Sequence, residues 1–162
     1  MITLYLEPSA LFKAYIPEKG SENIEYVLSN LGIRFVGLTS RWTILEIIRG
    51  FVKRKNLGEL TIDELNEIIA FFLDDIDRLA TARKLKIVEV TKSIIDKAID
   101  LVASENLYAA YAIHVRTAEL HKAKAILTDD IHVKRLSKVT PLRIINIELP
   151  EKKFLEIIKT LT

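Results

Sequence analysis

The feature that most constrains this fold is a regular alternation of short apolar runs with longer amphipathic segments. Five runs have the length and the β-branched or aromatic composition of strands, at residues 2–6, 33–38, 85–90, 123–127 and 142–147. The segments between them place apolar residues at helical spacing. Strands that are joined by helices run parallel, with helices on both faces of the sheet. The sequence therefore predicts an α/β fold, a three-layer α/β/α domain with a central, mostly parallel sheet.

Signals for helix starts support this division. Pro8 suits the first turn of a helix over residues 9–15, because the N–H that proline lacks has no partner there. Thr61 and Glu64 form a capping-box pattern that opens a long helix reaching about residue 82. An amphipathic helix over residues 150–162 closes the chain. Since no repeat and no linker-like stretch interrupts the pattern, residues 1–162 are expected to form a single domain.

The composition restricts the setting in which the chain works. No apolar stretch approaches the roughly 20 residues that span a bilayer, and no basic region precedes an apolar run at the N-terminus, so neither a membrane segment nor a signal peptide is expected. The absence of cysteine fits a cytoplasmic protein. A lack of glutamine beside abundant lysine and glutamate is typical of a thermophile. The net charge of +2 permits binding to nucleic acid without requiring it.

Carboxylates follow three of the predicted strands. Glu7 follows the first strand, Glu46 lies on the helix after the second, and Asp129 and Asp130 follow the strand at residues 123–127. Ligand sites in open α/β sheets form beyond the carboxyl ends of the strands. Mg²⁺ and Mn²⁺ prefer hard oxygen ligands such as these. The sequence therefore predicts a divalent-cation site at this edge of the sheet.

Each of these acids also has a structural explanation. The dipole of the helix behind Glu7 favours an acid at that position, and Glu46 can pair with Arg49 at the i+3 position of its own helix. Asp129 and Asp130 can cap the short helix that follows them. The coincidence of all three segments is more informative than any one of them, and two adjacent acids directly after a buried strand carry the most weight.

Four motifs occur in an order that resembles a known family. The chain carries Leu6-Glu7-Pro8-Ser9-Ala10 after its first strand, Thr39-Ser40 followed by Glu46, Tyr111-Ala112-Ile113-His114 on a predicted helix, and Leu127-Thr128-Asp129-Asp130. This arrangement, from about residue 2 to residue 147, is similar to that of the PIN-domain family of VapC-toxin-like ribonucleases. In that family the corresponding elements are a strand with Asp-Ser, a helical Glu, Asp-Ala-x-His, and a strand ending in Thr-x-Asp.

The resemblance implies a metal-dependent endoribonuclease of a toxin–antitoxin system, which hydrolyses RNA phosphodiester bonds with Mg²⁺ or Mn²⁺. It implies a small antitoxin-like protein and a homodimer as partners. The implied roles in this chain are as follows: Glu7, Glu46 and Asp130 as catalytic metal ligands, Asp129 as a further ligand, Ser9 and Thr128 as groups that orient the carboxylates, and Arg49, Lys53 and Tyr111 as contacts to RNA.

Two departures from the family pattern favour an alternative. Glu7 stands where the family has Asp, and Tyr111 stands where it has a third acid, which a neutral phenol does not replace as a cation ligand. The acidic site is therefore expected to be impaired, and the alternative is a catalytically inactive PIN-like domain that binds RNA or a protein partner. Tyr108 and Tyr111 can stack on bases or pack in the core. His114 is expected to be a structural residue, and His132 a surface one.

Overall fold

The computed structural model describes residues 1–138 and 140–161 and contains a five-stranded sheet. Its strands are β1 (Ile2–Leu6), β2 (Phe35–Ser40), β3 (Leu85–Val88), β4 (Ala125–Thr128) and β5 (Arg143–Asn146). The spatial order is β3-β2-β1-β4-β5, and every pairing is parallel. The prediction of a central parallel sheet is confirmed, and each strand lies within two residues of its predicted bounds. β1 occupies the middle of the sheet.

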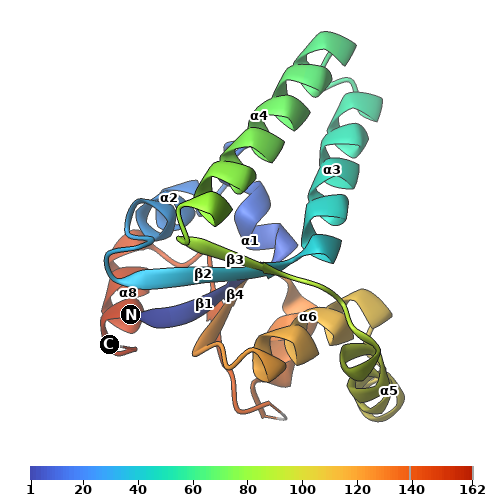
Figure 1. Cartoon of the computed structure of the whole chain (residues 1–162), viewed down its shortest axis with the longest axis vertical. Helices are drawn as coiled ribbons and strands as arrows, with labels where there is room; N and C mark the ends of the chain where they lie inside the picture. The colour runs from blue at the N-terminus through green and yellow to red at the C-terminus, as the bar shows by residue number, and fades with distance from the viewer. Residues whose placement is uncertain (139, 162) are drawn as a thin grey trace.

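Helices cover both faces of this sheet, so the predicted three layers are confirmed (Figure 1). They are α1 (Pro8–Phe12), α2 (Ser21–Ser29), α3 (Arg41–Asn56), α4 (Ile62–Thr81), α5 (Lys92–Glu105), α6 (Ala109–Leu120), α7 (Ile131–Arg135), the 3₁₀ turn η1 (Leu136–Lys138) and α8 (Glu151–Lys159). One core lies between the sheet and α1 to α4 with α8. The second lies between the opposite face and α5 to α7.

Side chains cap the starts of both α3 and α4, and the capping box of α4 is the one that the sequence predicted. Ser40 caps α3 through the N–H of Thr43, and Thr61 with Glu64 completes both bonds of a capping box on α4. The prediction was wrong for the first helix, which ends at Phe12 because the following residues form tight i to i+3 turns before Pro17. The closing helix is present as α8, while Thr162, within the predicted range 150–162, lies outside the described residues.

The helices α3 and α4 stand side by side and project beyond the sheet (Figure 1). At the base of this pair α3 packs closely against α1. A Cβ atom on Gly50 would lie 2.8 Å from the Phe12 ring, so the close approach of the two helices requires glycine at this position. This packing fixes the N-terminal half of α3, which carries Glu46, over the carboxyl ends of the strands. No helix of residues 1–138 and 140–161 is long and apolar enough to cross a membrane.

Candidate functional site

The acidic edge, as we call the group Glu7, Glu46, Asp129 and Asp130, lies at the carboxyl end of the sheet. Glu7 directly follows the central strand β1, and the two aspartates directly follow its neighbour β4. Glu46 lies in the second turn of α3, which begins where β2 ends. The parallel topology therefore brings the three predicted segments to one edge of the sheet.

Glu7 is only 3% exposed, and its Oε2 atom accepts three hydrogen bonds. The donors are the Ser9 N–H at 3.0 Å, the Thr128 hydroxyl at 3.0 Å and the Ser9 hydroxyl. Burial raises the pKa of the Glu7 carboxyl, although the charge of His114 and the hydrogen bonds from Ser9 and Thr128 oppose that rise. Glu7 is thus held in place as the acceptor that caps α1.

Ser9 and Thr128 connect Glu7 to the segment after β4. The Ser9 hydroxyl oxygen accepts the N–H of Asp129 at 2.9 Å, and the Thr128 hydroxyl oxygen accepts the N–H of Asp130 at 2.9 Å. The two hydroxyls are 3.2 Å apart. Both residues therefore lie between the acids that they were predicted to orient, and they position the backbone of the aspartates as well as the carboxylate of Glu7.

Glu46 belongs to a chain of hydrogen bonds that runs into the core. Its Oε2 lies 2.7 Å from Nε2 of His114, whose Nδ1 lies 2.8 Å from the Tyr5 hydroxyl. Because an ionised carboxylate only accepts, Nε2 donates to Glu46, and the direction of the bond between Nδ1 and the Tyr5 hydroxyl depends on the protonation of the His114 ring. His114 and Tyr5 are fully buried, so this chain fixes the Glu46 side chain from within the core. His114 is a hydrogen-bonded structural residue, as the sequence predicted.

Asp129 is paired with Lys13, a residue that the sequence analysis did not single out. The Lys13 ammonium is 2.7 Å from Oδ2 of Asp129, and it lies 3.2 Å from a carboxylate oxygen of both Glu18 and Glu148. Lys13 is itself 3% exposed. Arg54 extends the network through an ion pair with Glu18. A buried cation of the chain's own therefore already neutralises the charge at Asp129.

Asp130 and Tyr111 form the remaining corner of the edge. Oδ1 of Asp130 accepts the N–H of His132 at 2.7 Å and thereby caps α7, as one of the predicted alternatives had it. Burial raises the pKa of the Tyr111 hydroxyl, and so do its hydrogen bond to Asp130 and the charges of Asp130, Glu7 and Glu46. The phenol therefore keeps its proton, close to three of the four predicted ligands.

A divalent cation does not fit the acidic edge in this arrangement. Mg²⁺ requires about six oxygen ligands in near-octahedral geometry. Within residues 1–138 and 140–161, no group of three His, Asp or Glu side chains is placed to hold a metal ion. Glu46 is committed to His114, Asp129 to Lys13, and Asp130 to the start of α7. Each of these contacts uses one oxygen of its carboxylate, so what is missing in the described residues is convergence of the side chains on one centre.

The predicted basic residues lie on α3, further from the sheet than Glu46. Arg49 and Lys53 are both exposed, and within the described part of the chain neither forms an ion pair. They line a hollow of about 240 Å³ with Val52 and Asn56. Lys53 also lines a pocket of about 290 Å³ that includes Ser9, Glu46 and Asp129. Unpaired positive charge therefore borders the acidic edge.

No protein-family model and no curated protein sequence matches this chain. Solved structures do match its α/β fold with a parallel sheet. PAE2754 from Pyrobaculum aerophilum is 16% identical, with a TM-score of 0.64 over 98% of this chain and 90% of that one. A toxin–antitoxin complex from Klebsiella pneumoniae gives 15% identity and a TM-score of 0.56 over 89% of this chain and 97% of that one.

A third match is VapBC2 from Rickettsia felis, solved with a DNA fragment from its promoter. It is 16% identical, with a TM-score of 0.59 over 90% of this chain and 98% of that one. Identities this low establish likeness of fold. The chain is thus an α/β protein whose candidate site lies at the carboxyl edge of a parallel sheet, and its fold is the VapC-like PIN-domain fold that the four motifs indicated.

Proposed function

We propose that this chain is a PIN-fold protein of the toxin–antitoxin class that binds RNA without cleaving it through a divalent-cation centre. The observation that carries this proposal is the set of partners at the acidic edge. Lys13 supplies a positive charge to Asp129, and Tyr111 occupies the family's third acid position as a protonated phenol near Asp130. The carboxylates of the edge are therefore held by separate partners and do not converge in the described residues, whereas a cation site needs carboxylate oxygens that converge on one point.

Binding of RNA is supported by the charge on α3. Arg49 and Lys53 follow Glu46 at helical spacings of three and seven residues, so they share its stripe of the helix. Both are exposed and without ion pairs in the described residues, so they are available for phosphate groups. Each contact of this kind contributes affinity that is independent of sequence and weakens as salt rises.

The second candidate function is the metal-dependent endoribonuclease that the family resemblance implied, with Glu7, Glu46 and Asp130 as catalytic residues and Mg²⁺ or Mn²⁺ as the cofactor. One observation favours it. The pocket lined by Ser9, Glu46 and Asp129 opens to solvent, and the Glu46 side chain is 28% exposed, so a cation has access to two of the four acids.

Calorimetric titration of Mn²⁺ and Mg²⁺ into the purified chain separates the two candidates. We expect no binding at millimolar metal, and no cleavage of single-stranded RNA when Mn²⁺ is added. Micromolar binding that is lost in Asp130→Asn, together with cleavage that the same variant abolishes, would establish the nuclease and refute the proposal. Asp130→Asn keeps the side-chain oxygen that caps α7, so its fold is preserved.

Binding of RNA is tested separately, with a chelator present. Arg49→Ala and Lys53→Ala should each weaken binding of a fluorescent single-stranded RNA and lower the slope of log affinity against log salt by about 0.7, the value for one phosphate contact on a single strand. Lys152→Ala, on the exposed face of α8, is the matched control and should change neither quantity. Equal behaviour of all three variants would refute the role of α3.

We further propose an antitoxin-like protein partner and a homodimer. The projecting helices α3 and α4 expose apolar side chains such as Leu45, at 59%, and Phe71, at 62%, which a partner would cover. Light scattering after gel filtration should give twice the chain mass of 18.5 kDa. Co-expression with the product of an adjacent gene tests the antitoxin, and a monomer that captures no such product would refute both proposals.

A further inference from the structure

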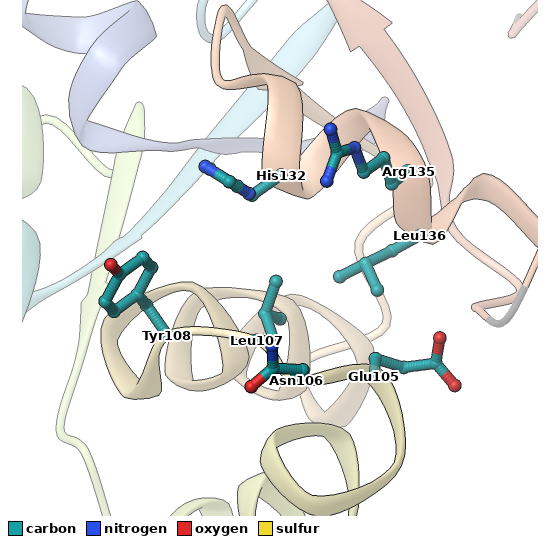
Figure 2. A pocket seen from close by; sticks show the side chains of 7 residues that line it. All are labelled: Glu105, Asn106, Leu107, Tyr108, His132, Arg135 and Leu136. Carbon is teal, nitrogen blue, oxygen red and sulfur yellow. The ribbon is translucent and has the colours of Figure 1, made fainter.

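A second cavity, which we call the aromatic pocket, lies between α7 and the turn that joins α5 to α6 (Figure 2). Its volume is about 490 Å³, within the range of small-molecule sites. The residues that line it are Glu105, Asn106, Leu107, Tyr108, His132, Arg135 and Leu136. None of them belongs to the acidic edge, and the family resemblance assigned a role to none of them.

The pocket has an apolar floor and an aromatic mouth. Leu107 and Leu136 are buried, whereas the Tyr108 side chain is 72% exposed. Tyr108 and His132 come from opposite walls (Figure 2), with ring centroids 6.1 Å apart and planes at 84°. Such a large exposed aromatic ring above an apolar floor suits a planar ligand that stacks on its face.

Three polar side chains of the pocket have no partner in the part of the chain that the structure describes. In residues 1–138 and 140–161, the side chains of Glu105, Asn106 and Arg135 form neither hydrogen bonds nor ion pairs. In Figure 2 Glu105 and Arg135 come from facing walls of the pocket. The planar guanidinium of Arg135 matches a phosphate group, and the carboxylate of Glu105 accepts hydrogen bonds from the amino groups of bases. Apolar, aromatic, cationic and anionic groups are thus presented together.

Tyr111 joins this pocket to the acidic edge. Its ring stacks on His132, with centroids 5.7 Å apart and planes at 17°, while the charge of Asp130 acts on its hydroxyl. It also meets Tyr108 edge to face at 6.0 Å. The residue that stands in place of the family acid therefore supports both aromatic side chains at the mouth of the pocket. A phosphodiester chain with one base in the pocket would pass Tyr111 toward the edge.

From these observations we infer that the aromatic pocket binds a single nucleotide unit. The base stacks on Tyr108, its amino group faces Glu105, and its phosphate faces Arg135. This unit is either an unpaired nucleotide of RNA, in which case the inference rests on the proposed RNA binding, or a free nucleoside monophosphate. Uracil lacks an exocyclic amino group, so a uridine unit binds less tightly than guanosine, adenosine or cytidine units.

The test is titration of the full chain, with a chelator present, by each of the four nucleoside monophosphates and by a fluorescent single-stranded RNA. Tyr108→Ala and Arg135→Ala should each weaken binding about tenfold, the loss of one stacking or charged contact. Tyr108→Phe should retain binding because it keeps the ring. Glu105→Gln should reduce the preference for GMP over UMP.

Two controls separate these contacts from general effects of charge and aromatic surface. Lys138→Ala removes an exposed positive charge close to Arg135 but outside the pocket, and Phe71→Ala removes a ring on α4 that is 62% exposed. Both should bind like the wild type. A loss of affinity in Lys138→Ala equal to that in Arg135→Ala would overturn the assignment of Arg135 as the contact to the phosphate.

The outcomes distinguish the two sources of the ligand and the two proposals. Weaker RNA binding in the pocket variants supports an RNA nucleotide, and weaker GMP binding alone supports a free nucleotide. If RNA binding depends on Arg49 and Lys53 but not on Tyr108 or Arg135, and no monophosphate binds, the pocket inference fails while the proposed function stands. If GMP binds in the pocket but RNA does not bind at all, the proposed function fails and the inference stands.

Discussion

The acidic edge and the aromatic pocket are neighbours that share one contact, the stacking of Tyr111 on His132. They differ in whether their charged side chains have partners among the described residues. At the edge, each carboxylate has a partner within the chain, and Lys13 is buried among three of the chain's carboxylates. In the pocket, the charged side chains of Glu105 and Arg135 have none among the described residues. Polar groups at the edge contribute to folding, whereas those of the pocket remain available to a ligand.

The largest effect that would sharpen this comparison is expected for Lys13→Met. The substitution removes the buried cation and leaves Asp129 without an ion pair among the described residues, while Glu18 keeps Arg54 and Glu148 keeps the more distant Lys19. The three carboxylates are 26–29% exposed. Loss of one partner from a buried ion pair costs about 3–5 kcal/mol, and the partial exposure of these carboxylates reduces the expected loss to about 2–4 kcal/mol. Unfolding in guanidinium chloride measures it.

Lys19→Met is the matched control for Lys13→Met. Lys19 reaches the same Glu148 at 3.9 Å, but its side chain is 73% exposed, so its removal should change the stability by less than about 0.5 kcal/mol. Similar losses in the two variants would show that the edge is not held together by its buried cation.

Tyr111→Asp is expected to have the next largest effect. It restores an acid beside Asp130, Glu7 and Glu46, whose charges already act on the Tyr111 hydroxyl. Without metal the added repulsion should lower the stability, and Mn²⁺ binding should tighten at least about tenfold. Tyr111→Phe keeps the ring and removes only the hydroxyl, so it should bind no more Mn²⁺ than the wild type. Calorimetry that finds no difference between the two variants would eliminate Tyr111 as the barrier.

The sequence predicted the edge but not its network, for a physical reason. Hydrophobic periodicity is a local signal, and it located all five strands and, through the parallel topology, placed Glu7, Asp129 and Asp130 at one edge. The partners of these acids are set by tertiary packing. His114 is 68 residues from Glu46 and 109 from Tyr5, and no periodicity connects them. Tyr111 was recognised only because it departs from a family motif.

Two features were missed for which the sequence held a weak signal. Lys13 lies between Phe12 and Ala14 in an otherwise apolar segment, and a lysine in such a place needs carboxylate partners. His132 was expected at the surface but is half-buried against Tyr111, because the short helix α7 returns over the start of α6. The stacking role predicted for Tyr108 remains a prediction. A pocket between one turn and the short helix α7 leaves no periodic pattern in the sequence, so only the structure could bring its residues together.

Glu7→Gln tests the acidic edge through the pH dependence of stability. Its effect on the free energy of unfolding should be smaller than the effects of Lys13→Met and Tyr111→Asp. Because burial raises the pKa of Glu7, the folded chain retains a proton that the unfolded chain loses near the ordinary value of 4.5. The contribution of Glu7 to stability is therefore full below that pH and declines as pH rises through the folded pKa. Glutamine offers the same acceptor without the charge, so the stability of the variant relative to the wild type should increase with pH above 4.5. A constant difference between the two unfolding curves would contradict this.

The smallest change in stability is expected for Arg135→Ala in the aromatic pocket. Like Lys13→Met at the acidic edge, this substitution removes a cation. Arg135 lies in the last turn of α7 and has no ion pair or hydrogen bond from its side chain within the described residues. Arg135→Ala should therefore change the free energy of unfolding by less than about 0.5 kcal/mol, as for a surface substitution. The same denaturant titration measures it, so the two cations are compared on one scale. A loss above about 1 kcal/mol would mean that Arg135 contributes to folding as Lys13 does, and the contrast between the closed edge and the open pocket would no longer hold.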